Sequence, residues 1–429
     1  MQKVIKPAKK LRGTIKIPGD KSISHRALIL GALAEGVSQI ENLSPAQDVR
    51  STAKCLQSLG ASIQIDESEY AKARVEGRGV GGLVAPSTNL DAGNSGTTMR
   101  LLAGVLAGYP FTATLTGDES LRKRPMKRVI EPLIQMGALV ESQNGLAPLK
   151  IHGGALHNVR YELPVASSQV KSAILLAGLN ACGETIVIEN APTRDHTERM
   201  LTYLEAPLRQ SGRCVSIQGD SVQYRARPIK VAGDISSAAF FLAAAALVPD
   251  SKITVEDVGL NPTRTGFLDV LQEMGVPVTI QNRREVCNEP WGNITAESAS
   301  LKAVTVGGAL VPRMIDELPM LAVLATQAQG KTVIRDAQEL RVKETDRISA
   351  VAENLKLMGA QIEAQPDGWI IQGPRKLKGA RVESYGDHRI VMAFAVAGLI
   401  AEGETVIEDA EWAAISFPSF FEKLELMRA

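Results

Sequence analysis

Cysteine and histidine are scarce in this chain, with only four and five copies in 429 residues. The cysteines are scattered and form no CxxC pair: Cys55, Cys182, Cys214 and Cys287. Neither a disulfide framework nor a zinc site is therefore expected. The neighbours Asp195 and His196 are of metal-binding types, but no further histidine or cysteine follows at ligand spacing, so we expect no metal there.

Aromatic residues and net charge are also low. Aromatics make up 4% of the chain and the formal net charge is +1, which argues against a base-stacking surface and against a global field for nucleic acid or an anionic membrane. No segment offers ~18 uninterrupted apolar residues, and the N-terminus lacks the residue succession of a signal peptide. We therefore expect a soluble cytoplasmic protein with no nucleic-acid or membrane partner.

An internal repeat is the main feature that the chain does have. Each of six copies begins with a small or polar cluster, runs into an apolar Ala/Leu-rich helix, and continues through a β-branched strand, in most copies to a second helix. The copies start near residues 20, 94, 167, 234, 316 and 387, a period of roughly 70 residues. A unit of this length predicts an α/β fold built from repeated modules.

The length suits about two or three domains, and 45% hydrophobic content is enough for sizeable cores. The six copies plausibly group three and three, with the divide near residues 227–230. The strand expected within residues 1–17 precedes copy one, so the pattern alone lets it complete either half.

The first repeat start, Gly19-Asp-Lys-Ser-Ile-Ser-His-Arg26, suits an anion. Asp20 or Ser22 can cap the expected helix, whose free N–H groups and dipole favour negative charge near Lys21. Ser22 and Arg26 are four apart and share a helix face. The alternative is a capped helix with two solvated cations.

Later repeat starts carry similar chemistry. A purely structural repeat requires caps there, but it does not require the charged and amide side chains that follow. We therefore expect helix N-termini to converge on a site. The residues concerned are Asn94, Ser95, Ser167, Ser168, Gln169, Asp316, Glu317, Asp387, His388 and Arg389.

Two cationic stretches add to this hypothesis. Five cations lie within residues 122–128, where Pro125 is expected at the first position of a helix and Arg124 at its anion-binding end. Lys343 and Arg347 are expected four apart on one helix face with Glu344 beside them, as two cations gripping an anion while the carboxylate moves a proton. Solvated surface helices are the alternative for both stretches.

The settings of Asp316 and Arg389 bear on their roles. Asp316 lies in a mostly apolar setting at an expected helix start, so it is either an N-cap or a general base toward a hydroxyl. Arg389 precedes an apolar run and would be costly to bury without an anion.

Six of these stretches, in this order, resemble the motifs of the 5-enolpyruvylshikimate-3-phosphate synthase family (3-phosphoshikimate 1-carboxyvinyltransferases). The resemblance runs from Lys10 to Phe421. It implies transfer of the enolpyruvyl group of phosphoenolpyruvate to the 5-hydroxyl of shikimate 3-phosphate, with release of phosphate and without cofactor or metal. The motifs are Gly19–Arg26, Gly93–Arg100, Lys123–Met126, Ser167–Gln169, Arg341–Arg347 and Gly386–Arg389.

The resemblance also implies a fold. Two similar domains would each hold three βαβαββ repeats, as an inside-out α/β barrel, with the active site in the interdomain cleft. Domain I would comprise residues 1–17 plus 232–429, and domain II residues 18–231. We expect a monomer.

Roles follow residue by residue from the same resemblance. Asp316 is the expected base toward the 5-hydroxyl, while Glu344 and Lys21 handle the proton at the phosphoenolpyruvate methylene. The expected shikimate 3-phosphate ligands are Lys21, Ser22, Arg26, Ser167, Ser168, Gln169, Arg194, Asp316 and Lys343. The expected phosphoenolpyruvate ligands are Lys21, Asn94, Gly96, Arg124, Gln169, Arg347 and Arg389.

Departures from the family pattern concern the inhibitor glyphosate. Residues 194–198 resemble the glyphosate-tolerant (class II) subgroup, although that subgroup usually reads Ser-Ala-Gln where this chain has Ser167-Ser168-Gln169. The best-studied subgroup has a lysine in the final motif near Phe417-Pro418, and the local sequence here is Ala414-Ile-Ser416-Phe-Pro. Gly96, rather than alanine, leaves room beside phosphoenolpyruvate, so tolerance is a hypothesis.

Two rival functions are considered. The sister enolpyruvyl transferase acting on UDP-N-acetylglucosamine typically has a cysteine before its Arg-Pro motif and Lys-Asn in its first motif. This chain has no cysteine in residues 117–122, and it has Lys21-Ser22. A non-catalytic phospholigand-binding protein on the same scaffold would lack Asp316 or Glu344, and both are present.

Overall fold

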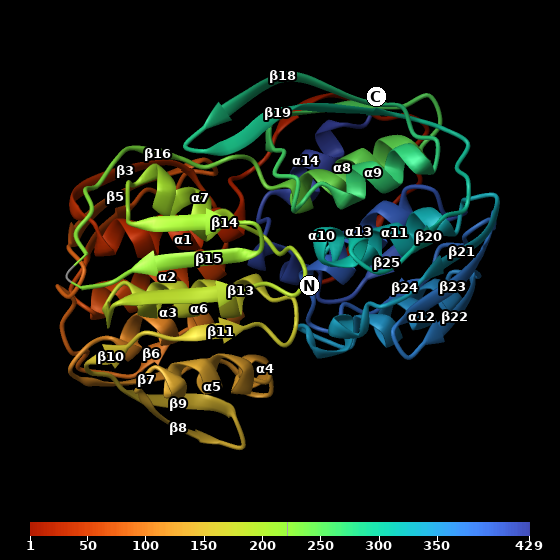
Figure 1. The fold of residues 1–429 in the computed structure, drawn as a ribbon. Helices are drawn as coiled ribbons and strands as arrows, with labels where there is room; N and C mark the ends of the chain where they lie inside the picture. Colours follow the sequence, from red (N-terminus) through yellow and green to blue (C-terminus); the bar gives the residue numbers. More distant parts are fainter. Residues whose placement is uncertain (221) are drawn as a thin grey trace. The chain divides into compact units, whose positions relative to one another are not determined.

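The computed structural model describes residues 1–220 and 222–429, and the chain forms two compact units (Figure 1). Unit 1 comprises Met1–Pro18, Ala232–Glu285 and Pro290–Ala429. Unit 2 comprises Gly19–Val231 together with Val286–Glu289, the tip of a hairpin whose strands start and end in unit 1.

Three four-stranded sheets in unit 2 share one topology. In each, a short strand runs parallel to a long one, which is followed by two antiparallel neighbours. A fourth, two-stranded parallel sheet joins β10 (Leu156–His157) to β12 (Ala181–Cys182). The three sheets, in strand order, are β16 (Ile229–Lys230), β3 (Glu35–Leu43), β5 (Ala71–Arg78), β4 (Ser62–Ile65); β6 (Leu90–Asp91), β7 (Thr112–Thr116), β9 (Leu146–His152), β8 (Leu139–Gln143); and β11 (Arg160–Glu162), β13 (Glu184–Ile188), β15 (Cys214–Gln218), β14 (Leu208–Ser211).

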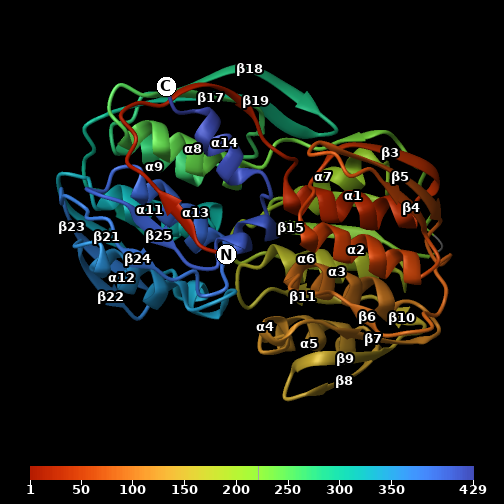
Figure 2. The same ribbon diagram turned by 180° about the vertical axis from the view of Figure 1, so that it is seen from behind.

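Two kinds of helix accompany these sheets. Apolar helices that are buried beyond their first turn open each repeat: α1 (Lys21–Leu33), α3 (Gly96–Ala107) and α6 (Ser168–Gly178). Figure 2 shows α1, α2 and α3 one below another. Because α1, α3 and α6 are apolar on all sides, they form the interior of the unit, while amphipathic helices bury one face. The remaining helices are α2 (Gln47–Ser58), α4 (Glu119–Arg122), α5 (Lys127–Gln135) and α7 (His196–Tyr203).

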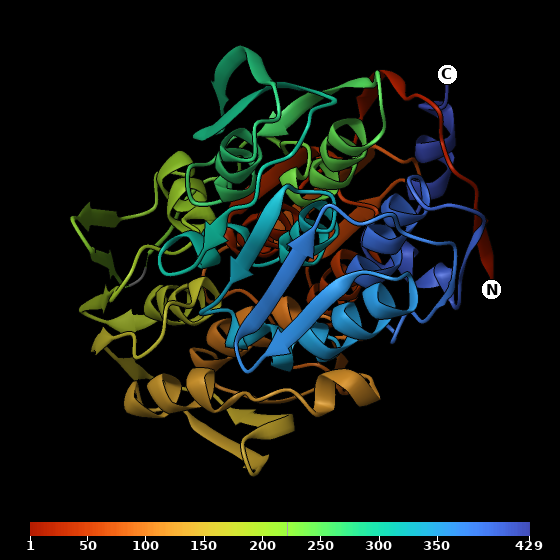
Figure 3. The ribbon, with the colours of Figure 1, turned by 90° about the vertical axis from the view of Figure 1, so that its right-hand side faces the viewer.

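Unit 1 repeats this plan in two four-stranded sheets and has a third sheet of three strands, with strands from both ends of the chain. The N-terminal strand β2 runs parallel to β17, and β1 runs antiparallel to β25. The cyan and light-blue strands of its second sheet are seen side by side in Figure 3. Its sheets, in strand order, are β18 (Val278–Val286), β19 (Glu289–Glu297), β17 (Lys252–Gly259), β2 (Arg12–Lys16); β20 (Thr305–Val306), β21 (Gly330–Ile334), β23 (Gly368–Gly373), β22 (Gln361–Gln365); and β1 (Lys3–Ile5), β25 (Thr405–Ile407), β24 (Arg381–Val382).

The core of unit 1 is built around three apolar helices, α8 (Ile235–Leu247), α11 (Leu318–Ala325) and α13 (His388–Gly398). Four residues of the N-terminal segment, Ile5, Leu11, Ile15 and Ile17, are buried in the same core. The other helical segments are α9 (Gly266–Glu273), α10 (Leu310–Met314), α12 (Arg347–Leu357), α14 (Phe420–Leu426) and the 3-10 turns η1 (Gln338–Val342) and η2 (Ala410–Ile415).

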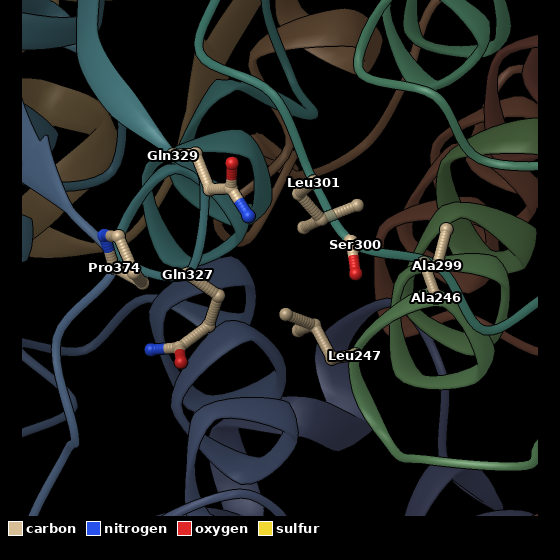
Figure 4. Close-up of a pocket in the computed structure, with 8 residues that line it drawn as sticks. All are labelled: Ala246, Leu247, Ala299, Ser300, Leu301, Gln327, Gln329 and Pro374. Carbon is tan, nitrogen blue, oxygen red and sulfur yellow. The ribbon is translucent and has the colours of Figure 1, made fainter.

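A small hollow of about 150 Å³ lies at the C-terminal end of α8 (Figure 4). None of the described residues that line it carries a charge, so it is poorly suited to a phosphate or carboxylate. The lining comprises Ala246, Leu247, Ala299, Ser300, Leu301, Gln327, Gln329 and Pro374. Among the helices of residues 1–220 and 222–429, none has the length and apolarity needed to cross a membrane.

Candidate active site

The start of α1 in unit 2 has the predicted cap. The Asp20 side chain accepts a hydrogen bond from the Ile23 backbone N–H at 2.9 Å. Gly19 is required before it, because a Cβ there would overlap the backbone of β3. Lys21 is the first helical residue, and its ammonium lies 2.8 Å from the carboxylate of Asp48 on α2. The sequence reasoning did not identify Asp48, because nothing in the spacing of α2 indicates that it faces α1.

Arg26 is a buried and hydrogen-bonded cation. Its guanidinium donates to the Ser22 carbonyl oxygen at 3.0 Å, to Thr197 Oγ1 at 2.6 Å and to Ser172 Oγ at 2.8 Å. Burial lowers the pKa of Arg26 to about 10, although the Glu198 carboxylate opposes that change. The alternative of two solvated cations at this helix start is therefore wrong for Arg26.

The second repeat start is organised by hydrogen bonds among polar side chains. Ser95 caps α3 by accepting from the Thr98 backbone N–H at 3.1 Å. Asn94 donates to the Asp118 carboxylate at 2.6 Å and accepts from Arg124 Nη2 at 2.7 Å. The cation of Arg124 is thus held beside the N-terminus of α3, where helix dipole and guanidinium both favour an anion.

The prediction that Pro125 is the first residue of a helix is wrong. Helix α5 begins at Lys127, with Met126 at the N-cap. The backbone N–H of Arg124 bonds to the Leu121 carbonyl and closes α4, so the chain turns before α5 begins. Arg124 reaches an anion-binding helix end at α3 rather than at α5.

Arg100 is a candidate site residue, because it contacts two predicted site residues, and the sequence reasoning missed it. Its Nη1 donates to Gln169 Oε1 at 2.7 Å, and Gln169 donates in turn to Thr97 Oγ1 at 3.0 Å. A Cβ on Gly96 would lie 2.7 Å from the same Nη1 atom. The available signal was an arginine within an apolar helix, which is costly to bury without a partner.

The third repeat start lies at α6. Ser167 caps the helix by accepting from the Val170 backbone N–H at 3.4 Å, and Ser168 and Gln169 are half-buried. Arg194 is half-buried in the segment before α7. Side-chain bonds of Arg26 and Arg100 link α6 to α1 and to α3 near their N-terminal ends, as the predicted convergence requires within this unit.

In unit 1, a carboxylate lies among three cations. Asp316 has the Lys343 ammonium at 3.7 Å, the Arg347 guanidinium at 3.5 Å and the Arg389 guanidinium at 3.8 Å. Its side chain is 14% exposed. Asp316 is not an N-cap, because Glu317 holds that position at α11 and makes no capping bond.

Lys343 and Arg347 do not share a helix face, so that prediction is wrong. Lys343 is extended at the end of η1, and α12 begins only at Arg347. The cause is Asp346, whose side chain accepts from the backbone N–H groups of Ile348 and Ser349 and caps a new helix. The break still places both cations near Asp316.

Arg347 is the most heavily paired of these cations. Its guanidinium lies 2.6 Å from the Glu344 carboxylate and 2.7 Å from that of Asp387. Burial alone would lower the pKa of Arg347, but these two carboxylates raise it above the ordinary value. Asp387 also caps α13 by accepting from the Arg389 backbone N–H, so one carboxylate orients two predicted site cations.

The pair Asp195-His196 makes protein contacts in unit 2. The His196 ring nitrogen Nδ1 lies 2.7 Å from the Glu289 carboxylate, and Asp195 accepts from Arg199. Across the described residues, no group of three or more histidine, cysteine or acidic side chains could hold a metal ion.

The fold corresponds to that of solved structures. The chain superposes with a TM-score of 0.88 on an EPSP synthase from Acinetobacter baumannii, at 42% identity over 100% of this chain and 98% of that one. This match confirms the predicted α/β fold of enolpyruvyl transferases.

Sequence relatives and a family model agree with this fold. A 3-phosphoshikimate 1-carboxyvinyltransferase of Gloeobacter violaceus is 53% identical over 427 residues, covering 99% of this chain and 98% of the relative. One from Bacillus thuringiensis subsp. konkukian is 51% identical over 417 residues, covering 97% and 96%. The family model for EPSP synthase (3-phosphoshikimate 1-carboxyvinyltransferase) matches residues 5–424, so the chain belongs to that family.

Proposed function

We propose that this chain transfers the enolpyruvyl group of phosphoenolpyruvate to the 5-hydroxyl of shikimate 3-phosphate and releases phosphate, in the shikimate pathway to aromatic amino acids. The observation that carries the proposal is the set of three cations, Lys343, Arg347 and Arg389, around Asp316 in unit 1. Substrates that bear phosphate and carboxylate groups require such fixed cations.

The same cations explain how Asp316 would become a base. Without substrate, the Asp316 carboxylate interacts electrostatically with all three cations. An anionic substrate would compete for these cations, and a carboxylate released from them is better able to accept a proton. Asp316 would then take the proton of the 5-hydroxyl as its oxygen attacks C2 of phosphoenolpyruvate.

The second proton moves at C3 of phosphoenolpyruvate. Glu344 and Lys21 would deliver a proton to the methylene as the C–O bond forms, which gives a tetrahedral intermediate. Removal of a proton from C3 and departure of phosphate with its C–O electron pair would then regenerate the double bond. The cations would stabilise the charge that develops in both steps.

The remaining assignments belong to the same proposal. Shikimate 3-phosphate would be bound by Lys21, Ser22, Arg26, Ser167, Ser168, Gln169, Arg194, Asp316 and Lys343. Phosphoenolpyruvate would be bound by Lys21, Asn94, Gly96, Arg124, Gln169, Arg347 and Arg389. The capped helix starts of unit 2 support these roles, because each presents free backbone N–H groups to an anion.

We also propose the domain boundaries, the localisation, the oligomeric state and the inhibitor of this protein. Domain I would be residues 1–17 plus 232–429 and domain II residues 18–231, in a cytoplasmic monomer. Glyphosate would inhibit the enzyme, and the motif at residues 194–198 supports the tolerant class II subgroup. A glyphosate titration that gave inhibition at concentrations far below those needed for tolerant relatives would contradict the subgroup assignment.

Phosphate release from phosphoenolpyruvate tests the reaction. We expect release with shikimate 3-phosphate as acceptor and none with UDP-N-acetylglucosamine. Release of phosphate with UDP-N-acetylglucosamine would indicate that the chain is the sister enolpyruvyl transferase instead. Absence of release with either acceptor, despite stabilisation by both substrates, would indicate a binding protein without catalysis.

A further inference from the structure

A buried charge network in unit 2 has no part in the chemistry above. Lys171 lies on α6 two residues after Gln169, and its side chain is completely buried. The ammonium lies 2.8 Å from the Glu189 carboxylate and 2.5 Å from that of Glu198. Burying one cation with two carboxylates is costly, and apolar side chains of similar size would often be as stable. Stability alone therefore does not account for this network.

The network connects α6 to the segment that carries Arg194. Glu189 also accepts from the Thr193 backbone N–H at 3.1 Å and from Thr193 Oγ1 at 2.5 Å. Glu198 lies in the first turn of α7. Lys171 is thus linked to both sides of Arg194. It is linked through Glu189 to Thr193, the residue before Arg194, and through Glu198 to α7, the helix that follows.

The same elements hold Arg26. Ser172, next to Lys171, and Thr197, next to Glu198, bond to each other at 2.7 Å. Both hydroxyls accept from the Arg26 guanidinium. Two successive residues of α6 therefore meet two successive residues of α7, and the pairing fixes a cation of α1.

We propose that Lys171, together with Glu189 and Glu198, is a positioning residue that sets Arg26 and the Arg194 segment relative to the start of α6 for the phosphorylated acceptor. This inference rests on the proposed function, in which those residues bind shikimate 3-phosphate. We expect the effect to be specific for the acceptor, because the network binds Thr193 and α7 on either side of Arg194, while the adjacent residues Ser172 and Thr197 bind Arg26. Two residues proposed for phosphoenolpyruvate, Asn94 and Arg124, are instead held by each other.

The test compares Lys171→Met with Lys171→Arg and with a matched control, Ile151→Ala. Ile151 is buried on β9 of the same unit and takes no part in the network. The readouts are KM for each substrate, kcat, melting temperature, and amide hydrogen exchange of residues 190–199. We expect Lys171→Met to raise KM for shikimate 3-phosphate roughly tenfold, to leave KM for phosphoenolpyruvate within about twofold, and to speed exchange in residues 190–199.

Lys171→Arg should recover most of the acceptor affinity, whereas Ile151→Ala should lower the melting temperature and move neither KM. Equal changes in both KM values, or an unchanged KM for the acceptor, would overturn the inference. If Lys171→Met does not fold, Glu198→Gln, which keeps the shape of the side chain, gives the same comparison. A wild-type protein without turnover would refute the proposed function instead, and unchanged exchange in residues 190–199 would then still refute the role of Lys171.

Discussion

Asp316 faces three cations, Lys343, Arg347 and Arg389, and its side chain keeps some exposure to solvent. Asp316→Asn keeps the shape but removes the proton acceptor, so we expect kcat to fall by roughly 10²- to 10⁴-fold. Binding of shikimate 3-phosphate, measured by calorimetry, should persist. Asp269→Asn is the control, because that half-exposed carboxylate pairs with Arg313 at 2.7 Å. Near-normal turnover of Asp316→Asn would contradict the proposed base.

The guanidinium of Arg100 leaves no room for a side chain at Gly96. In Gly96→Ala the new Cβ would lie 2.7 Å from Arg100 Nη1, the atom that donates to Gln169, so that guanidinium must shift. We expect KM for phosphoenolpyruvate to rise by roughly tenfold or more, with little change in melting temperature. Gly154→Ala is the control, since nothing lies within 4 Å of its Cβ position. Equal KM values for phosphoenolpyruvate in the two variants would show that Arg100 can shift without affecting binding.

At the scale of elements, the cap of α1 could be predicted from local sequence. Asp20 or Ser22 was expected there, and Asp20 holds the position, because a cap depends on residues within three positions along the chain. The segment around Lys343 was mispredicted because one carboxylate, Asp346, ended one turn and began the next helix. Arg100 was not singled out because its partner lies on another repeat, and sequence spacing within one helix carries no information about such a partner.

The helix starts of unit 2 are also joined by a buried histidine. His25 Nδ1 lies 2.7 Å from Thr52 Oγ1, and Thr52 bonds to Thr98 Oγ1 at 2.6 Å, so the chain of bonds runs from α1 through α2 to α3. Burial lowers the pKa of His25 well below 6.5, with Lys21 and Arg26 adding to that effect. The unfolded chain therefore binds a proton more readily than the folded protein as the pH falls.

This lowered pKa gives stability that is fully present above pH 6.5 and is lost progressively as the pH falls below it. We expect the free energy of unfolding to decline by up to about 1.4 kcal/mol per pH unit from this group. His25→Gln should be less stable at neutral pH but should lack this part of the slope. Denaturant titrations at several pH values measure the free energy of unfolding. Parallel plots of that energy against pH for the wild type and His25→Gln would contradict the role given to His25.

At the scale of the whole molecule, the repeat period predicted the kind of module but left the N-terminal strand open. The structure pairs β2 with β17 and β1 with β25, because the sheets of unit 1 have free edges that these strands complete. A hydrophobic pattern indicates that a strand will be buried, but it does not specify which edge receives it.

Removal of residues 1–17 should therefore unfold unit 1 selectively. It deletes two strands and four buried core residues, Ile5, Leu11, Ile15 and Ile17. All three tryptophans, Trp291, Trp369 and Trp412, belong to unit 1, so their emission reports on that unit alone. We expect red-shifted tryptophan emission with substantial helical circular dichroism retained, and recovery when the 1–17 peptide is added. Native emission from the truncated protein would contradict this prediction.

The strand β2 also has a consequence for synthesis on the ribosome. Translation proceeds from the N-terminus, so residues 1–18 emerge well before their neighbours β17 and β25, which are made more than two hundred residues later. The residues of unit 2 up to Val231 are complete in the meantime. The nascent chain must therefore keep the apolar segment with Ile15 and Ile17 unpaired while residues up to Val231 fold. Holding such a segment apart from other nascent chains is work suited to a chaperone.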